Sequence, residues 1–179
     1  MILDFKKLMG VYIMEHILIT YSAECAEKGH IDPNFTQLVY GNSKSNGDIV
    51  KKHIKPGSYI FFNARIDQKR FITAYFEVEK VLIKGKQDSE INALKCDARV
   101  DEVVLIGDRN RSKVLTAPLP LDRELIGRLT SYGADDAYFN KKLAGGCSEL
   151  EAIKDKTLNP KIITEEEKEL LIDLCMNRG

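Results

Sequence analysis

The stretch that most constrains the fold is Ser58–Lys80, SYIFFNARIDQKRFITAYFEVEK, which predicts two β-strands joined by a tight turn at Asp67–Lys69. Successive side chains of a strand point to opposite faces of the sheet, so every second residue shares a face. One face of this hairpin is apolar along both strands and consists of Ile60, Phe62, Ala64, Ile66, Ile72, Ala74, Phe76 and Val78. This pattern predicts one continuous buried surface.

The other face of the hairpin mixes aromatic and polar side chains: Tyr59, Phe61, Asn63, Arg65, Phe71, Thr73, Tyr75 and Glu77. Aromatic rings can stack on a planar ligand, and polar groups can bind it by hydrogen bonds. Alternatively, this face forms a second core, if the sheet curls or helices cover it. The sequence leaves both interpretations open.

The rest of the chain favours the α+β class, because strands lie close together in sequence and helices lie between and after them. Shorter β-rich runs are at His16–Tyr21, Phe35–Tyr40, Glu102–Gly107 and Val114–Ala117. Leucine spacing predicts a helix at Leu121–Leu129, and a capping box of Thr164 and Glu167 predicts a C-terminal helix. We therefore expect a small curved mixed β-sheet or a β-barrel, with peripheral helices and a C-terminal helix.

The length of 179 residues fits a single domain, with a core at about residues 11–130 and a helical C-terminal extension at about residues 131–179. Lysine and arginine number 27, and so do aspartate and glutamate. This balance argues against indiscriminate binding along a duplex but is compatible with a local basic patch.

The four cysteines form no CxxC pair, so the sequence predicts no metal site and no cofactor. No apolar run approaches the roughly 18 residues of a membrane span, and no secretory signal is convincing. We expect a cytoplasmic protein with reduced thiols and no membrane partner.

A candidate binding site on the mixed face combines stacking with hydrogen bonding. Tyr40, Phe61 and Tyr75 could frame a slot for a planar base, and stacking contributes roughly 1–3 kcal/mol per base. Asn63 could read the edge of that base, since an amide both donates and accepts hydrogen bonds. The alternative is again a second core.

Two basic segments could hold phosphates beside such a slot. Lys52 lies in one, and Arg109 and Arg111 lie in the turn Asp108–Lys113. Arginine forks suit phosphate oxygens. The alternative is that both segments are solvated turns without a ligand.

His30 and Asp32, in the segment GHIDPN, could form an acid–base pair, because histidine titrates near neutral pH and a carboxylate can orient it. Alternatively, Asp32 makes a turn hydrogen bond and His30 is exposed. Two such residues do not complete a metal site.

The run KPGSYIFFNARI, followed by a turn and RFITAYFEVEKV, resembles the core of PUA-like domains, a superfamily that includes the EVE, ASCH and YTH domains. The order His30-Ile31-Asp32-Pro33, Tyr40-Gly41 and Pro56-Gly57 resembles the nucleotide-modification-associated members of this group. The resemblance covers about residues 16–107. It implies a compact β-barrel that recognises nucleic acid, often through a modified base.

These features give three hypotheses. The first is a module that binds DNA or RNA carrying a modified or flipped base, in which Asp32 and Asn63 bind the base edge. The second is an enzyme of nucleotide or base modification that uses His30 and Asp32. The third is an adaptor whose C-terminal helix, Thr164–Gly179, docks a partner or a second copy of the chain.

Overall fold

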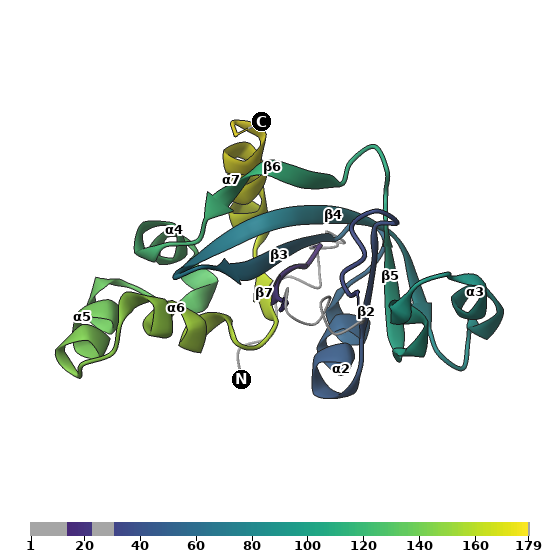
Figure 1. The fold of residues 1–179 in the computed structure, drawn as a ribbon, viewed down its shortest axis with the longest axis horizontal. Coiled ribbons are helices and arrows are strands. Elements are labelled where there is room, and N and C mark those ends of the chain that lie inside the picture. Colours follow the sequence, from purple (N-terminus) through teal and green to yellow (C-terminus); the bar gives the residue numbers. More distant parts are fainter. Residues whose placement is uncertain (1–13, 23–30, 179) are drawn as a thin grey trace, which may run out of the picture.

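The computed structural model describes residues 14–22 and 31–178 (Figure 1). Its strands are β1 (His16–Thr20), β2 (Val39–Asn42), β3 (Tyr59–Ile66), β4 (Lys69–Ile83), β5 (Val103–Gly107), β6 (Lys113–Pro120) and β7 (Lys161–Ile163). Its α-helices are α2 (Lys44–His53), α3 (Asp88–Ala93), α4 (Arg123–Arg128), α5 (Asp136–Ala144), α6 (Glu149–Thr157) and α7 (Glu165–Met176). Two short 3₁₀ segments are η2 (Asp97–Val100) and η3 (Thr130–Tyr132).

Strands β3 and β4 form the predicted hairpin, in which Tyr59 pairs with Glu77 and Ile66 pairs with Lys69. Asp67, in the turn, has a φ of 53°, in the left-handed region that aspartate tolerates better than most residues. The hairpin prediction is confirmed. Strand β4 continues beyond the hairpin and pairs with β5 from Val78 onward, with a register shift between Val78 and Lys80.

Strand β4 organises the sheet because it has partners on both edges. On one edge the Val78 N–H donates to the Ser58 carbonyl, next to β3; on the other, the Asp108 N–H donates to the Glu77 carbonyl, between β5 and β6. Strand β1 is parallel to β3 and antiparallel to β7. The order is β2-β5-β4-β3-β1-β7, with β6 also paired to β4.

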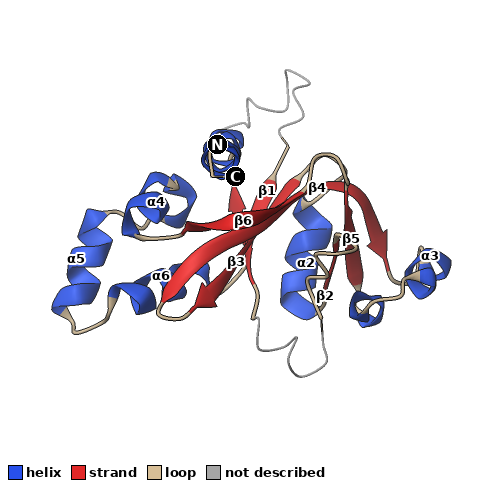
Figure 2. Ribbon diagram, turned by 45° about the horizontal axis from the view of Figure 1, so that its top comes forward, coloured by secondary structure: helices blue, strands red, loops and turns tan. Residues whose placement is uncertain are grey.

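The mixed sheet with helices around it agrees with the predicted α+β class (Figure 2). A barrel is not supported. Closure would require the two end strands, β2 and β7, to pair, and within the described residues β2 pairs only with β5 and β7 only with β1. The sheet therefore stays open.

Both faces of the sheet are covered, so the molecule has a core on each side (Figure 1). The α2 core consists of Ile17, Ile19, Tyr40, Val50, Ile54, Ile60, Phe62, Ala74, Phe76, Val78, Val103 and Leu105. The C-terminal core consists of Leu18, Phe61, Ile72, Tyr75, Leu115, Leu119, Leu121, Leu125, Ile126, Leu129, Tyr132, Ala134, Phe139, Ala152, Ile153, Ile163, Leu171 and Cys175. Phe61 and Tyr75 of the mixed face therefore lie in a second core under the C-terminal helices, whereas Arg65 of the same face is exposed.

The predicted continuous apolar face is correct in its middle and wrong at the hairpin tip. Ile72 lies in the C-terminal core, whereas Ala74 lies in the α2 core. Register shifts after Phe62 and after Ile72 interrupt the strict alternation of faces. Ile66, near the turn, is 42% exposed.

Helix α7 begins with the predicted capping box, in which Thr164 and Glu167 bond each other's backbone N–H groups. Its apolar stripe is used inside the chain, because Leu171 is buried in the C-terminal core and Leu170 and Leu174 pack against that core. This occupies the surface that the adaptor hypothesis assigned to a partner. None of the helices in residues 14–22 and 31–178 combines the length and the apolar character of a membrane span.

Candidate functional site at the hairpin tip

The aromatic residues predicted to form a base slot lie in different cores. Tyr40 packs against Phe62 in the α2 core, with ring centroids 5.3 Å apart. Phe61 and Tyr75 lie 5.8 Å apart in the C-terminal core. All three are at most 5% exposed. The predicted shared slot is therefore wrong, because the sheet separates its members and helices cover them.

Asn63 is fully buried, and its amide bonds to other groups of the protein. Its Nδ2 donates to the Ile19 carbonyl at 2.9 Å and to Thr20 Oγ1 at 3.0 Å, while its Oδ1 accepts from Arg70 Nη1 at 2.9 Å. Thr20 Oγ1 in turn donates to the Thr157 carbonyl at 2.6 Å. Asn63 therefore positions an arginine and does not read a base edge.

The predicted phosphate-binding residues do not converge on an aromatic face. Lys52 is exposed on α2, while Arg109 and Arg111 are exposed in the β5–β6 loop. Figure 1 shows α2 and this loop on opposite sides of the β4 ribbon. Arg111 Nη1 is bonded to Glu77 Oε1 at 2.7 Å, so its charge is already paired within the chain.

His30, one half of the predicted acid–base pair, lies outside the described residues. Asp32 is partly buried, and its Oδ1 accepts from the Gly41 N–H at 3.0 Å. Burial, with a smaller contribution from the Asp101 and Asp97 carboxylates, raises the pKa of Asp32 to about 7. Its carboxyl group can therefore exchange protons near neutral pH.

The strongest candidate site is a pair of arginines that sequence reasoning did not single out. Arg65 on β3 and Arg70 on β4 are direct cross-strand partners at the tip of the hairpin. Arg65 is exposed, whereas Arg70 is only 8% exposed. Like charges directly opposite one another destabilise a strand pair. This arrangement needs an explanation.

Neither arginine has a carboxylate within ion-pair distance among the described residues. Arg65 donates from Nε to the Asp67 carbonyl and from Nη2 to Gln68 Oε1, both at 2.8 Å. Arg70 donates to Asn63, and its buried Nε has no partner within residues 14–22 and 31–178. Burial, followed by the charge of Arg65, lowers the pKa of Arg70. An anion between the two guanidinium groups would relieve both effects.

A cavity of about 640 Å³ lies beside the pair. It is lined by Thr20, Tyr21, Ser22, Arg65, Asp67, Arg70 and Leu158. Asp67 is the carboxylate of this lining, and it belongs to an exposed turn. A second cavity of about 460 Å³ shares Arg70 and lies between the hairpin tip and α6. We call the first the hairpin-tip cavity.

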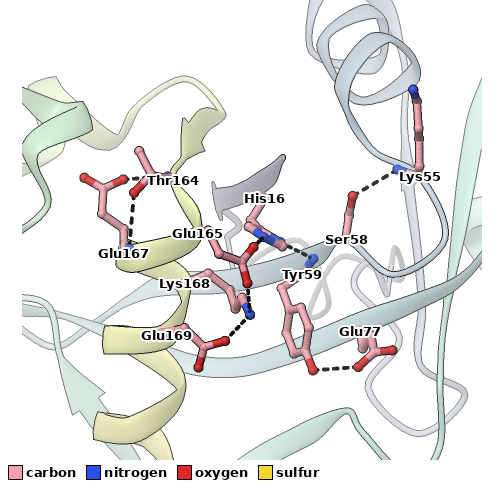
Figure 3. Close-up of polar contacts among 10 residues, drawn as sticks. All are labelled: His16, Lys55, Ser58, Tyr59, Glu77, Thr164, Glu165, Glu167, Lys168 and Glu169. Carbon is pink, nitrogen blue, oxygen red and sulfur yellow. Dashed lines mark hydrogen bonds and ion pairs between the residues drawn. The ribbon is translucent and has the colours of Figure 1, made fainter. Parts of the chain in front are cut away.

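A second polar cluster joins α7 to the root of the hairpin (Figure 3). His16 is 1% exposed; its Nδ1 accepts from the Tyr59 N–H at 2.9 Å, so its Nε2 carries the proton and donates to Glu165 at 2.6 Å. Burial lowers the pKa of His16. Lys168 pairs with Glu165 at 2.6 Å and also with Glu169. Because these charges have partners, we interpret this cluster as a structural fastening of α7.

The sequence carried one overlooked signal for Arg70. Arg70 is two residues before Ile72, and residues two apart in a strand share a face, so the sequence pattern places Arg70 on the face predicted to be buried. A charged residue at such a position is rarely buried without a partner.

Among residues 14–22 and 31–178, no group of three histidine, cysteine, aspartate or glutamate side chains is placed to hold a metal ion. No protein-family model matches the chain, and no curated protein matches its sequence. The functional argument therefore rests on the residues themselves.

Proposed function

We propose that this protein binds nucleic acid, with a phosphate group of the strand held in the hairpin-tip cavity between Arg65 and Arg70. The observation that carries the proposal is a buried arginine directly opposite a second arginine, with no carboxylate paired to either among the described residues. Burying an unpaired charge is costly. Natural chains retain such a charge more readily when a ligand supplies its partner.

The chemistry of the pair favours phosphate. A guanidinium group presents N–H donors in a planar fork that matches two phosphate oxygens, and charge-assisted bonds of this kind are about twice as strong as neutral ones. The cavity of about 640 Å³ lies within the range of roughly 300–1,000 Å³ of small-molecule sites. It has room for a nucleotide and not only for an isolated ion.

Among phosphate-bearing ligands, the sequence pattern favours nucleic acid, because the hairpin segment resembles PUA-like domains. Fold-level resemblance alone is a weak argument for function. Here it is combined with a local positive site in a chain whose total charge is balanced. The rings of Tyr40, Phe61 and Tyr75 have no part in the proposal, since they are core residues.

The test is fluorescence anisotropy with labelled single-stranded and duplex DNA and RNA of about 10 nucleotides. Titrations at about 50 and about 200 mM salt measure the contribution of phosphate contacts. The wild-type protein is compared with Arg70→Met, which keeps an unbranched side chain without the charge. Arg111→Met is the control, because it removes an arginine of the β5–β6 loop that is paired with Glu77, far along β4 from the hairpin tip.

We expect salt-sensitive binding of at least one of these nucleic acids, weakened by Arg70→Met and nearly unchanged by Arg111→Met. Absence of binding to all of them at low salt contradicts the proposal. Equal weakening by the two substitutions also contradicts it, because a diffuse charge effect would then replace the specific site. Thermal denaturation of each variant shows whether a loss of binding reflects a loss of folding.

A further inference from the structure

We infer, building on the proposed function, that the hairpin-tip cavity selects a terminal phosphate monoester, the phosphorylated end of a strand, over the diesters within a strand. The inference concerns the charge and the number of oxygens that the site can satisfy. It follows from the cross-strand arrangement of Arg65 and Arg70 and from the fixed position of Arg70.

The charge of the site matches a dianion better than a monoanion. Arg65 and Arg70 are cross-strand partners and both line the cavity, so an anion bound there meets two positive charges. A phosphate monoester carries about −1.5 to −2 at neutral pH, whereas a diester carries one negative charge. Asp67 also lines the cavity, but it is exposed in the turn, where water and salt screen its charge. Arg70 is buried and much less screened.

The number of donors points to the same conclusion. The two arginines lie on different strands, and Ser22 also lines the cavity. Arg65 already donates from Nε and Nη2 and Arg70 from Nη1, whereas the buried Nε of Arg70 has no partner among the described residues. Two other hydroxyls on the lining are committed, because Thr20 bonds to Thr157 and Tyr21 bonds to Thr73. A monoester offers three terminal oxygens to these donors, and a diester offers two. Leu158, 60% exposed on the rim, provides an apolar contact for the rest of the nucleotide.

Arg70 is held in place by a chain of hydrogen bonds that runs through Asn63 and Thr20 to the end of α6. Asn63 binds its Nη1, Thr20 binds Asn63, and the Thr157 carbonyl at the end of α6 binds Thr20. Asn63 is thus a positioning residue. Because the Arg70 guanidinium is fixed inside the cavity, it favours a phosphate that can enter the cavity, such as the one at the end of a strand. An internal phosphate of a nucleic-acid backbone that crosses the opening of the cavity would reach it less well.

The experiment compares unlabelled single strands of one sequence and about 10 nucleotides as competitors for the labelled strand. The competitors carry a 5′-hydroxyl, a 5′-phosphate, a 3′-phosphate or a 5′-phosphate capped as its methyl ester. The methyl cap keeps the phosphate and removes one negative charge at constant pH. Each competitor is measured with wild type, Arg65→Gln, Arg70→Met and the control Arg111→Met.

We expect a terminal phosphate to improve affinity by about 10-fold, since it adds charge-assisted hydrogen bonds. The methyl cap should remove most of this gain. Arg65→Gln, an exposed substitution that spares the buried network, should abolish the preference, whereas Arg111→Met should retain it.

Two results overturn the inference, and they are distinguishable. If all four competitors bind equally while Arg70→Met weakens every one, the protein binds internal diesters, and the proposed function stands without this inference. If neither Arg65→Gln nor Arg70→Met alters the affinity for any competitor, the proposed function fails and the inference fails with it.

Discussion

The two ends of the β3–β4 hairpin differ in how their cations are paired. At the root, Arg111 pairs with Glu77, and Lys168 pairs with Glu165. At the tip, Arg65 is the cross-strand partner of Arg70, and neither arginine forms an ion pair with a carboxylate among the described residues. The same two strands carry both ends. Strand pairing therefore does not explain the difference. What differs is the presence of a nearby acid: Glu77 lies on β4 beside Arg111, and Glu165 lies on α7 together with Lys168.

One acid at the root, Glu165, lies in the first turn of α7, where it contacts His16 and Lys168 (Figure 3). At the tip, the end of α6 supplies only the Thr157 carbonyl, which reaches Arg70 through Thr20 and Asn63. Neutral groups can orient a guanidinium without neutralising it. We therefore interpret the paired cations at the root as having a structural role. The two arginines at the tip, which form no ion pair among the described residues, indicate a site for an anion.

The largest effect should come from Asn63→Leu, which leaves the buried Arg70 Nη1 without its acceptor. We expect the free energy of unfolding to fall by about 3 kcal/mol, because an unsatisfied buried charged donor loses its solvation without compensation. Urea denaturation measures this. The double variant Asn63→Leu/Arg70→Met should recover more than half of the loss, and a double variant as unstable as the single one would show that Asn63 acts independently of Arg70.

The next effect is on binding. Arg70→Met should weaken nucleic-acid binding roughly 10- to 100-fold, because hydrogen bonds to charged groups contribute about 1.5–3 kcal/mol. Without ligand its free energy of unfolding should be unchanged or higher, since the substitution removes repulsion from Arg65. Anisotropy and urea denaturation on the same samples test both parts. If Arg70→Met lowers both the free energy of unfolding and the affinity, Arg70 has a structural role like that of the paired cations at the root.

The root should respond to pH through His16. Burial lowers its pKa in the folded state below its ordinary value of 6.5. Between the folded and unfolded pKa values, the unfolded chain binds a proton that the folded chain does not. The contribution of His16 to the free energy of unfolding should therefore decrease as the pH falls below about 6.5 and be fully retained above it. Asp32, whose pKa is raised to about 7 in the folded state, contributes in the opposite direction over this range.

Urea denaturation between pH 7.5 and 5 measures this dependence, and His16→Asn is the control because its amide oxygen can still accept from the Tyr59 N–H. Relative to the variant, the wild-type protein should lose stability as the pH falls. Identical slopes in the two proteins would show that His16 does not titrate differently in the folded and unfolded states.

The smallest effect should come from the ion pair of Glu77 and Arg111, in which Arg111 is 66% exposed. A double-mutant cycle with Glu77→Gln and Arg111→Met should give an interaction free energy of at most about 1 kcal/mol, reduced by added salt. An interaction free energy as large as that between Asn63 and Arg70 would contradict the expectation that the solvated pair is weaker than the buried network.

The sequence by itself determined the local elements. Alternation of apolar residues predicted the β3–β4 hairpin, and the Thr164–Glu167 capping box predicted the start of α7. These features depend on neighbours within a few residues, which a sequence displays directly. The strand expected at Phe35–Tyr40 is less accurate, because β2 begins only at Val39 and its bounds depend on pairing with β5.

Tertiary structure decided what the elements do. The register shifts near the hairpin tip and the C-terminal helices determine which aromatic rings are buried, so the predicted slot of Tyr40, Phe61 and Tyr75 became two cores. The opposition of Arg65 and Arg70 follows from pairing register. Charge compensation is a property of neighbours in space. The sequence contained both arginines, and only the fold showed that they are cross-strand partners with no carboxylate paired to either among the described residues.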